Sequence, residues 1–366
     1  MKETIERVSA EELRAFCTGA LEKLHVPRGD AQVTAEVLVE ADLRGIDSHG
    51  VARMGRYVSG IQQGMMRPNA KPKLVHETSN TGTIDADAGL GQPVSHKAME
   101  LAIEKAREHS LGFVAVKNSN HFGIAGFYAM MALAEDMIGI CTTNTEVIVV
   151  PTFARNALLG TNPIAIAVPS GKERPFVLDM STSTVTRGKV EVYARLEKPM
   201  PLNWATDEEG LATDDPARVI QNIIQRSGGG LLPLGGALEE SGGHKGYGMA
   251  LAVEIFSAVL PGALYANRVY PKGEDGKPLP SGIGHFFGAI RIDAFRSKDE
   301  FKDDMDDLIR RLKTAPKTRE ANRIYIHGEK EFEHAEQLAK LGIPLNPKVA
   351  EDLRGIARQL GMSKPF

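Results

Sequence analysis

Cysteine is scarce in this sequence, which has only Cys17 and Cys141 among its 366 residues. Two cysteines cannot build a disulfide scaffold or a zinc or iron–sulfur site held by cysteines. Long apolar runs are missing too, because no stretch approaches the ~20 consecutive apolar residues of a membrane-spanning helix. The N-terminal segment is charged from its second residue and has no apolar stretch of signal-peptide length. These absences predict a cytoplasmic protein without a membrane span.

Charge of one sign is not in excess, since 44 basic and 47 acidic residues give a net charge of -3. A nucleic acid or an anionic membrane is therefore not an expected partner, and a small-molecule partner is the default. Several motifs are absent as well: no GxGxxG follows a predicted strand, and GxxxxGK[ST], HExxH and GxSxG do not occur. The missing GxGxxG disfavours a Rossmann dinucleotide fold.

The pattern of apolar residues predicts an α/β protein. Helical spacing dominates the first 65 residues, which open with a capping box at Ser9, and it returns in the tail at 331–360. Between these ends, strands and helices alternate. We therefore predict a helical domain from 1–74 with 306–366, and an α/β domain from 75–305. The expected strands are 82–86, 111–116, 138–142, 165–169, 176–178 and 285–292. The expected helices of this part of the chain are 93–109, 123–136, 247–260, which should be buried, and 299–313. Residues 198–222 are expected to form surface excursions.

The first candidate site lies in the segment DSHGVARMGRY. His49, Arg53 and Tyr57 are spaced at i, i+4 and i+8, so a helix would carry a base, a cation and a phenol on one face. An imidazole can remove a hydroxyl proton and a guanidinium can hold a carboxylate. The alternative is a solvated helix face. Asp47 with its two neighbours resembles a catalytic triad in composition, but adjacent side chains are not expected to align for proton relay.

Two further candidates are polar loops beside predicted strands. His121 lies in KNSNHFG, which follows the strand ending at Val116, and ligands commonly bind at the carboxyl ends of strands. The alternative is a capping or turn histidine. The turns GTNP (160–163) and DMSTS (179–183) offer hydroxyl, amide and backbone N–H groups that suit ribose and phosphate oxygens, although they also fit ordinary turns.

Glycine is above its usual share, at 37 of 366 or about 10% against a usual ~7%. Many glycines lie between Ser227 and Gly248, directly before an apolar helix. Glycines let a backbone approach a ligand closely, a helix N-terminus favours an anion, and Lys245 adds a positive charge. This segment is an anion site in outline, or else a flexible hinge.

Taken in order, the motifs SHGVAR, NSNHFG, GTNPIAIAVP, DMSTS, LPLGG, GGHKGYG and IHGEK resemble the malate/L-lactate dehydrogenase family, which is of non-Rossmann type. The resemblance implies a non-Rossmann NAD(P)-binding α/β domain, a homodimer, and hydride transfer between NAD or NADP and C2 of a 2-hydroxy acid. It implies His49 and His121 as catalytic residues; Ser48, Arg53, Tyr57 and Lys117 as substrate-binding residues; Thr145, Asn162, Asp179, Met180, Ser181, His244, Lys245, Gly328 and Glu329 as cofactor-binding residues; and no metal.

The similarity favours (S)-malate as the substrate, and leaves lactate, sulfolactate, another 2-hydroxy acid, a ketone or a cyclic imine open. A dicarboxylate needs a second cation, for which the sequence offers Arg44, Arg56, Lys117 and Arg187. Two other classes are disfavoured. A metal-dependent hydrolase built on the two histidines lacks a third ligand at a suitable spacing. A non-catalytic nucleotide-binding module has no use for a base, a cation and a phenol together.

Overall fold

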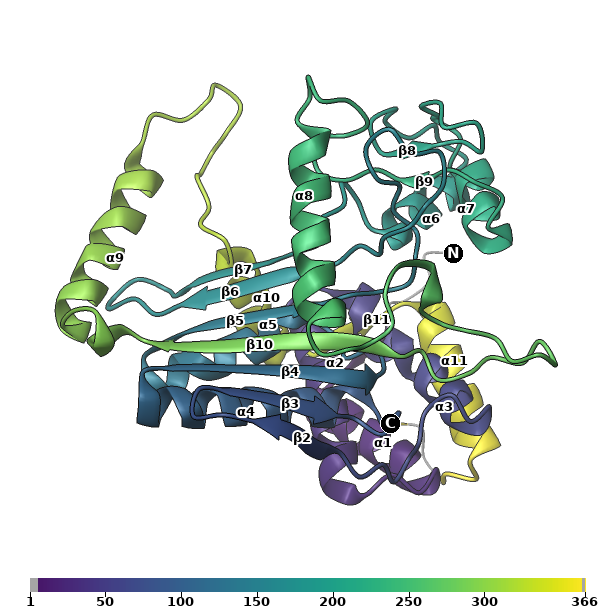
Figure 1. Cartoon of the computed structure of the whole chain (residues 1–366), viewed down its shortest axis with the longest axis horizontal. Helices are drawn as coiled ribbons and strands as arrows, with labels where there is room; N and C mark the ends of the chain where they lie inside the picture. Colours follow the sequence, from purple (N-terminus) through teal and green to yellow (C-terminus); the bar gives the residue numbers. More distant parts are fainter. Residues whose placement is uncertain (1–5, 364–365) are drawn as a thin grey trace.

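A mixed sheet forms the centre of the computed structural model, which describes residues 6–363 and 366 (Figure 1). In these residues the sheet has seven strands in the order β2-β3-β4-β10-β5-β6-β7. Only β3 and β4 run parallel; the other neighbours are antiparallel. The strands are β2 (Lys73–Glu77), β3 (Thr81–Asp85), β4 (Leu111–Ser119), β5 (Met137–Thr143), β6 (Ile164–Val168), β7 (Phe176–Met180) and β10 (Ile283–Arg291). The α/β prediction is confirmed, with β2 as an additional edge strand.

Two helices, α4 (Gly91–His109) and α5 (Ala125–Met131), pack on one face of this sheet. Glycines in the strands let the helices approach closely. A Cβ at Gly112 would lie 1.9 Å from the Ala102 carbonyl oxygen, and one at Gly139 would lie 1.9 Å from the Ala129 carbonyl oxygen. The predicted helix 123–136 is shorter than expected, because a 3-10 turn, η3 (Ala132–Glu135), ends it.

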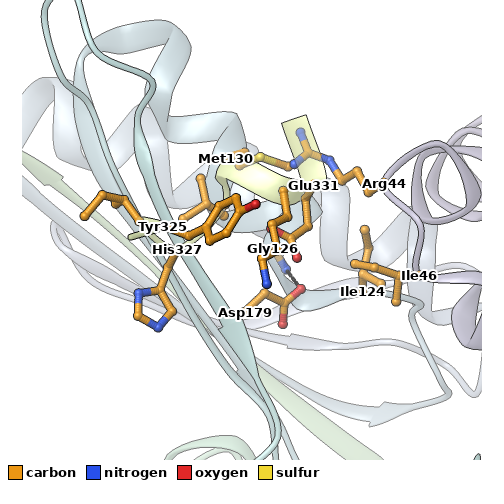
Figure 2. Close-up of a pocket in the computed structure, with 13 residues that line it drawn as sticks. Arg44, Ile46, Ile124, Gly126, Met130, Asp179, Tyr325, His327 and Glu331 are labelled. Atoms are coloured by element: carbon orange, nitrogen blue, oxygen red, sulfur yellow. Dashed lines mark hydrogen bonds between the residues drawn. The ribbon is translucent and has the colours of Figure 1, made fainter. Parts of the chain in front are cut away.

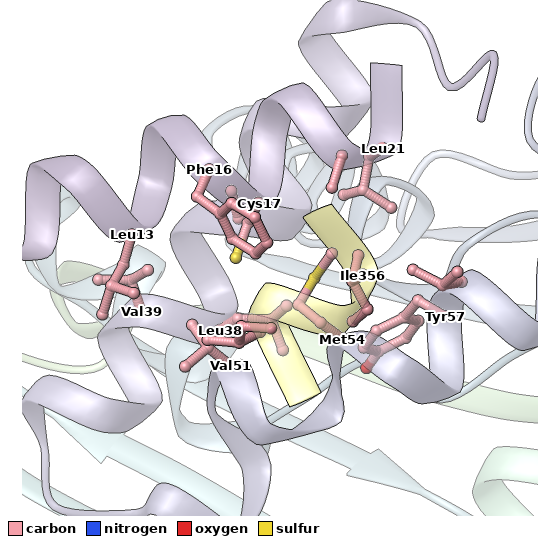
Figure 3. Packing of buried hydrophobic residues seen from close by; sticks show 14 of the residues in the cluster. Leu13, Phe16, Cys17, Leu21, Leu38, Val39, Val51, Met54, Tyr57 and Ile356 are labelled. Carbon is pink, nitrogen blue, oxygen red and sulfur yellow. The ribbon is translucent and has the colours of Figure 1, made fainter. Parts of the chain in front are cut away.

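The two ends of the chain pack together around one apolar core (Figure 3). This layer contains α1 (Ala10–Lys23), α2 (Arg28–Leu43), α3 (Met54–Gln62) and α11 (Pro347–Gln359). The capping box at Ser9 is confirmed. The tail is not one helix, because β11 (Ile343–Leu345) separates α10 (Glu329–Leu341) from α11 and pairs with β1 (Glu6–Val8). The two-domain division stays a prediction, and its limit at residue 305 falls inside α9 (Lys298–Thr314).

A small lobe with its own core corrects the prediction of surface excursions at 198–222. It contains α6 (Arg187–Arg195), β8 (Ala205–Thr206), α7 (Pro216–Gln225) and β9 (Gly230–Leu231). Its apolar residues are scattered among polar ones, which hid the pattern, but Val190, Val219 and Leu231 are fully buried together.

A long helix stands against the sheet on the side away from α4 and α5 (Figure 1). It consists of α8 (Gly243–Glu254) and a π-helical turn, η4 (Ile255–Val259). The prediction of a buried helix at 247–260 is wrong for its outer side, where Ile255, Phe256 and Val259 are about half exposed, at 47%, 48% and 52%. The turns η5 (Ala266–Arg268) and η6 (Ile292–Ala294) complete the elements. Within the part of the chain described, no helix is long and apolar enough to cross a membrane.

Candidate active site

The segment that carries His49 and Tyr57 is not one helix, which corrects the predicted stripe. Two 3-10 turns, η1 (Asp47–His49) and η2 (Val51–Arg53), precede α3 and meet at Gly50. The carboxylate of Asp42 lies against Gly50, where a Cβ would come within 1.8 Å of Oδ1, and it accepts a 2.8 Å hydrogen bond from the Val51 N–H. This buried carboxylate therefore holds the chain in the bend that presents His49.

His49 and His121 come from distant parts of the sequence and lie face to face. Their rings stack with centroids 5.5 Å apart and an interplanar angle of 22°. Nδ1 of His121 lies 2.8 Å from the hydroxyl of Tyr57, which is fully buried and not part of a solvated face. Nδ1 of His49 lies 2.9 Å from the Ser48 hydroxyl, so these two adjacent side chains do align, contrary to the expectation. Asp47 is exposed and takes no part in that contact.

Both histidines are neutral at pH 7. Burial, followed by the positive charges of Arg53 and Arg56, lowers the pKa of His49 to about 4. Burial, followed by Arg56 and by His49, lowers the pKa of His121 well below its usual value. Burial also raises the pKa of Tyr57, so its hydroxyl keeps its proton. A neutral imidazole has a lone pair that can accept a proton.

Two partly buried arginines lie close to the histidine pair. Nε of Arg53 donates a 2.6 Å hydrogen bond to the Ser48 carbonyl oxygen, and Arg56 donates a 2.7 Å hydrogen bond to the Tyr270 hydroxyl. Among the described residues, neither guanidinium forms a salt bridge with a carboxylate. Tyr270 was not predicted, because it stands in an irregular loop with no motif; its φ of 52° is the one local sign of a constrained position.

A cavity of about 180 Å³ adjoins the two histidines. It brings together predicted residues from three separate segments: Ser48, Thr145, Asp179, Met180 and Ser181. A second cavity of about 260 Å³ shares the side chains of Ile46, Ile124 and Asp179 with the first (Figure 2). Predicted Gly328 lines this second cavity, together with Arg44 and Glu331.

Asp179 stands where the two cavities meet. Its carboxylate accepts a 2.7 Å hydrogen bond from the Gly126 N–H, drawn in Figure 2. The side chain is exposed to the cavities that it lines, but protein surrounds them, and this burial raises the pKa of Asp179 to about 6. A carboxylate in such a place can accept hydrogen bonds from hydroxyl groups of a ligand.

Seven predicted site residues do not line either cavity. Two of them, Arg53 and Tyr57, lie beside the histidine pair instead. Asn162 turns its amide away from them and donates a 2.7 Å hydrogen bond to Glu254. Glu329 is buried in salt bridges with Lys313 and Arg323. The others are Lys117 in β4 and the exposed pair His244 and Lys245 in the first turn of α8. Local motifs indicated polar loops correctly but not the direction of each side chain.

Of the four candidates for a second cation, Arg56 lies beside the histidines and Arg44 lines the second cavity. Arg187 is close enough to Arg53 to affect its pKa, but it is paired with Glu191 at 2.9 Å. Within residues 6–363 and 366, no group of three or more His, Cys, Asp or Glu side chains could hold a metal ion.

Comparisons with known proteins agree with the motifs. A family model described as malate/L-lactate dehydrogenase matches residues 8–354. A malate dehydrogenase of Pyrococcus abyssi is 46% identical over 360 residues, which cover 98% of this chain and 96% of that protein. An L-sulfolactate dehydrogenase of Methanocaldococcus jannaschii is 40% identical over 343 residues, 94% of each chain. The crystal structure of malate dehydrogenase from Entamoeba histolytica matches with a TM-score of 0.94 at 36% identity, covering 99% of this chain and 100% of that one. The chain therefore belongs to the malate/L-lactate dehydrogenase family, as its motifs predicted.

Proposed function

We propose that this enzyme transfers a hydride between a nicotinamide cofactor, NAD or NADP, and C2 of (S)-malate. The observation that carries the proposal is the pairing of two neutral histidines with Arg53 and Arg56, which have no carboxylate partner among the described residues. Partly buried guanidinium groups without a salt-bridge partner favour an anionic ligand, and two of them match the two charges of a dicarboxylate.

The residues around the two cavities fit a nicotinamide dinucleotide. The hydroxyls of Thr145 and Ser181 and the carboxylate of Asp179 are donors and acceptors for ribose hydroxyls. The adjoining cavity adds apolar walls from Ile124 and Val177, on which an adenine ring can pack. When bound, a nicotinamide ring supplies the acceptor for the hydride that leaves C2 of the hydroxy acid.

The side chains of this protein would do the remaining work. Arg53 and Arg56 hold the carboxylates, which orients C2 and its hydroxyl. We assign His121 as the group that accepts the hydroxyl proton at Nε2, because the buried Tyr57 holds its ring at Nδ1. His49, stacked on that ring, limits its rotation and excludes water. In the reverse direction the His121 imidazolium returns the proton to the carbonyl oxygen.

The test measures absorbance of the reduced cofactor with malate, lactate and sulfolactate, each with NAD and with NADP. Wild type is expected to oxidise malate, and His121→Ala to lose kcat by at least about 100-fold while still binding cofactor. His49→Ala is the matched variant and should lose less. If no hydroxy acid reduces either cofactor while one of them binds, the proposal fails, and ketone or imine reduction takes its place.

Sulfolactate is the second candidate substrate. It carries a sulfonate where malate has its second carboxylate, so the same two arginines suit it, and the relative from Methanocaldococcus jannaschii is named for it. The ratio of kcat/KM for malate and sulfolactate, measured in the same experiment, decides between them.

A homodimer is part of the proposal, because the exposed apolar side of η4 continues into the apolar sheet face of β10, β4 and β6. Phe256 of η4 lies 5.2 Å from Phe286 of β10, which lies 5.7 Å from Phe113 of β4, measured between ring centroids. In β6 the isoleucines on the same face are only partly buried, whereas Ala165 and Ala167 face the core. A continuous apolar surface of this kind is typical of a subunit interface. The cytoplasmic location stays a prediction from composition.

A further inference from the structure

His285 is a buried histidine that takes no part in the chemistry proposed so far. It lies in the central strand β10, opposite Val116 of β4 and Thr143 of β5, and has no exposed surface. Burial lowers the pKa of its imidazole to about 3, although the backbone of Asn120 acts in the opposite direction, so the ring is neutral at pH 7. A neutral imidazole still has a polar N–H and a lone pair that need partners, which an apolar side chain at this position would not. A histidine in the middle of a buried sheet therefore calls for an explanation.

The imidazole of His285 contacts the ends of both neighbouring strands. Its Nε2 lies 2.8 Å from the hydroxyl of Ser119, the last residue of β4. Its Nδ1 lies 2.7 Å from the hydroxyl of Thr143, the last residue of β5. The ring also stacks on Phe122, with centroids 4.5 Å apart and an interplanar angle of 8°. Phe122 and Thr143 both line the first cavity, so His285 supports the site from behind without lining it.

The loop that carries His121 is held at several points in succession. The side-chain amide of Asn120 donates hydrogen bonds of 3.0 and 2.8 Å to two backbone carbonyl oxygens of the loop before α4. The residues on either side, Ser119 and Phe122, are the two that contact His285. His121 stands between Asn120 and Phe122 in the sequence. The backbone that leads into His121 and the residue that follows it are therefore both fixed by buried contacts.

We propose that His285 is a positioning residue for the base His121. Through Ser119 and Phe122 it holds the backbone on both sides of His121 in place. This keeps Nδ1 of His121 at 2.8 Å from the Tyr57 hydroxyl and leaves Nε2 directed at the substrate. A displacement of about 1 Å at a reacting group can lower a rate about 100-fold, so small movements of this loop matter. The inference rests on the proposed function for the role of His121 as the base.

The kinetic test separates the two nitrogens of His285. The amide of a glutamine reaches the place of Nε2, so His285→Gln can keep the bond to Ser119. The amide of an asparagine reaches only the place of Nδ1, so His285→Asn can keep only the bond to Thr143. We expect His285→Asn to lower kcat about 100-fold, and His285→Gln to keep kcat within about tenfold of wild type. The KM for malate and the cofactor Kd should not change, because Arg53 and Arg56 lie on another segment.

Nitrogen NMR of protein labelled in its 10 histidines gives a readout that does not depend on catalysis, and His121→Gln assigns the signal. In His285→Asn the Nδ1 signal of His121 should move, because its contact with Tyr57 becomes longer and weaker. In His285→Gln it should stay close to its wild-type position. Ser119→Ala should reproduce the changes seen in His285→Asn, and the two substitutions together should add little, because both remove the same contact.

Ser257→Ala is the matched control, because Ser257 is also fully buried and its hydroxyl lies 2.8 Å from that of Thr142 in β5. It removes a buried hydrogen bond from the same sheet without touching the His121 loop, and it should change neither kcat nor the His121 signal.

Two results would overturn the inference. One is a His285→Asn enzyme with the kcat and the His121 signal of wild type. The other is an equal loss in His285→Asn and His285→Gln, which would show that the bond to Ser119 is not the cause. If His285→Asn does not fold, Ser119→Ala decides in its place, since it leaves the imidazole intact. If wild type oxidises no hydroxy acid, the proposed function fails instead, and the NMR signals still decide whether His285 positions His121.

Discussion

The carboxylate of Asp42 should destabilise the fold at neutral pH although it shapes the active-site bend. Burial raises the pKa of Asp42 from an ordinary 3.8 to about 7, against the opposing hydrogen bond from Val51; the nearby Asp47 raises it further. Each pKa unit corresponds to about 1.4 kcal/mol, so ionised Asp42 lowers the free energy of unfolding by about 4 kcal/mol above pH 7. Because the folded-state pKa is the higher one, this cost is absent below pH ~4 and grows as the pH rises to about 7.

Asp42→Asn removes the charge and keeps an oxygen that can accept from the Val51 N–H. In urea unfolding at pH 8 we expect the free energy of unfolding of this variant to exceed that of wild type by up to about 4 kcal/mol. Near pH 4 the two proteins should unfold at the same urea concentration. The difference should grow by about 1.4 kcal/mol per pH unit between these limits and then level off. Asp352→Asn, at an exposed position on α11, is the control and should show no such trend. A variant that is less stable at pH 8, or a difference independent of pH, would refute the reasoning.

Three further outcomes are expected. Arg53→Met should raise the KM for malate about 10- to 100-fold, through loss of a charge-assisted contact, with the cofactor Kd unchanged; an unaltered KM would remove Arg53 from the substrate site. Phe256→Asp should produce monomers in sedimentation velocity, whereas Leu211→Asp, at an exposed position in the small lobe, should not; a Phe256→Asp dimer would place the interface elsewhere. Glu254→Gln should weaken cofactor binding about tenfold in a fluorescence titration. The carboxylate of Glu254 accepts hydrogen bonds at both oxygens from the loops beside the first cavity, and the amide keeps only one acceptor oxygen. An equal Kd would show that those loops need no such support.

Elements with a strong local signal were predicted well. The capping box at Ser9 begins α1, and the predicted helix 93–109 corresponds to α4, which starts two residues earlier. Strands that alternate within one buried layer were also found, because burial on one face imprints a period of two on the sequence. The edge strand β2 was missed since all its residues are exposed and carry no such period.

The motifs predicted which residues form the site, but they did not predict how the chain brings those residues together. His49 and Tyr57 do meet at His121, but through two 3-10 turns around Gly50 and not along one helix face. The bend depends on Asp42, which lies in the preceding helix and gives no sign of this contact in the local pattern. Asn162 shows the opposite error, because its motif is in the correct loop while its amide serves Glu254.

The protonation state of the histidines is the property farthest from the sequence. An isolated imidazole with a pKa near 6.5 would be mostly neutral at pH 7 but would not be held in one tautomer. Here burial against the helical layer lowers the pKa values of His49 and His121, and Tyr57 from α3 contacts one nitrogen. Each contribution comes from a different segment of the chain, and each exists only once the two chain ends have packed on the sheet. A base that is neutral, oriented and free at one nitrogen therefore depends on the whole fold. For this reason the motif could indicate the histidine, whereas its protonation state and orientation follow only from the packing.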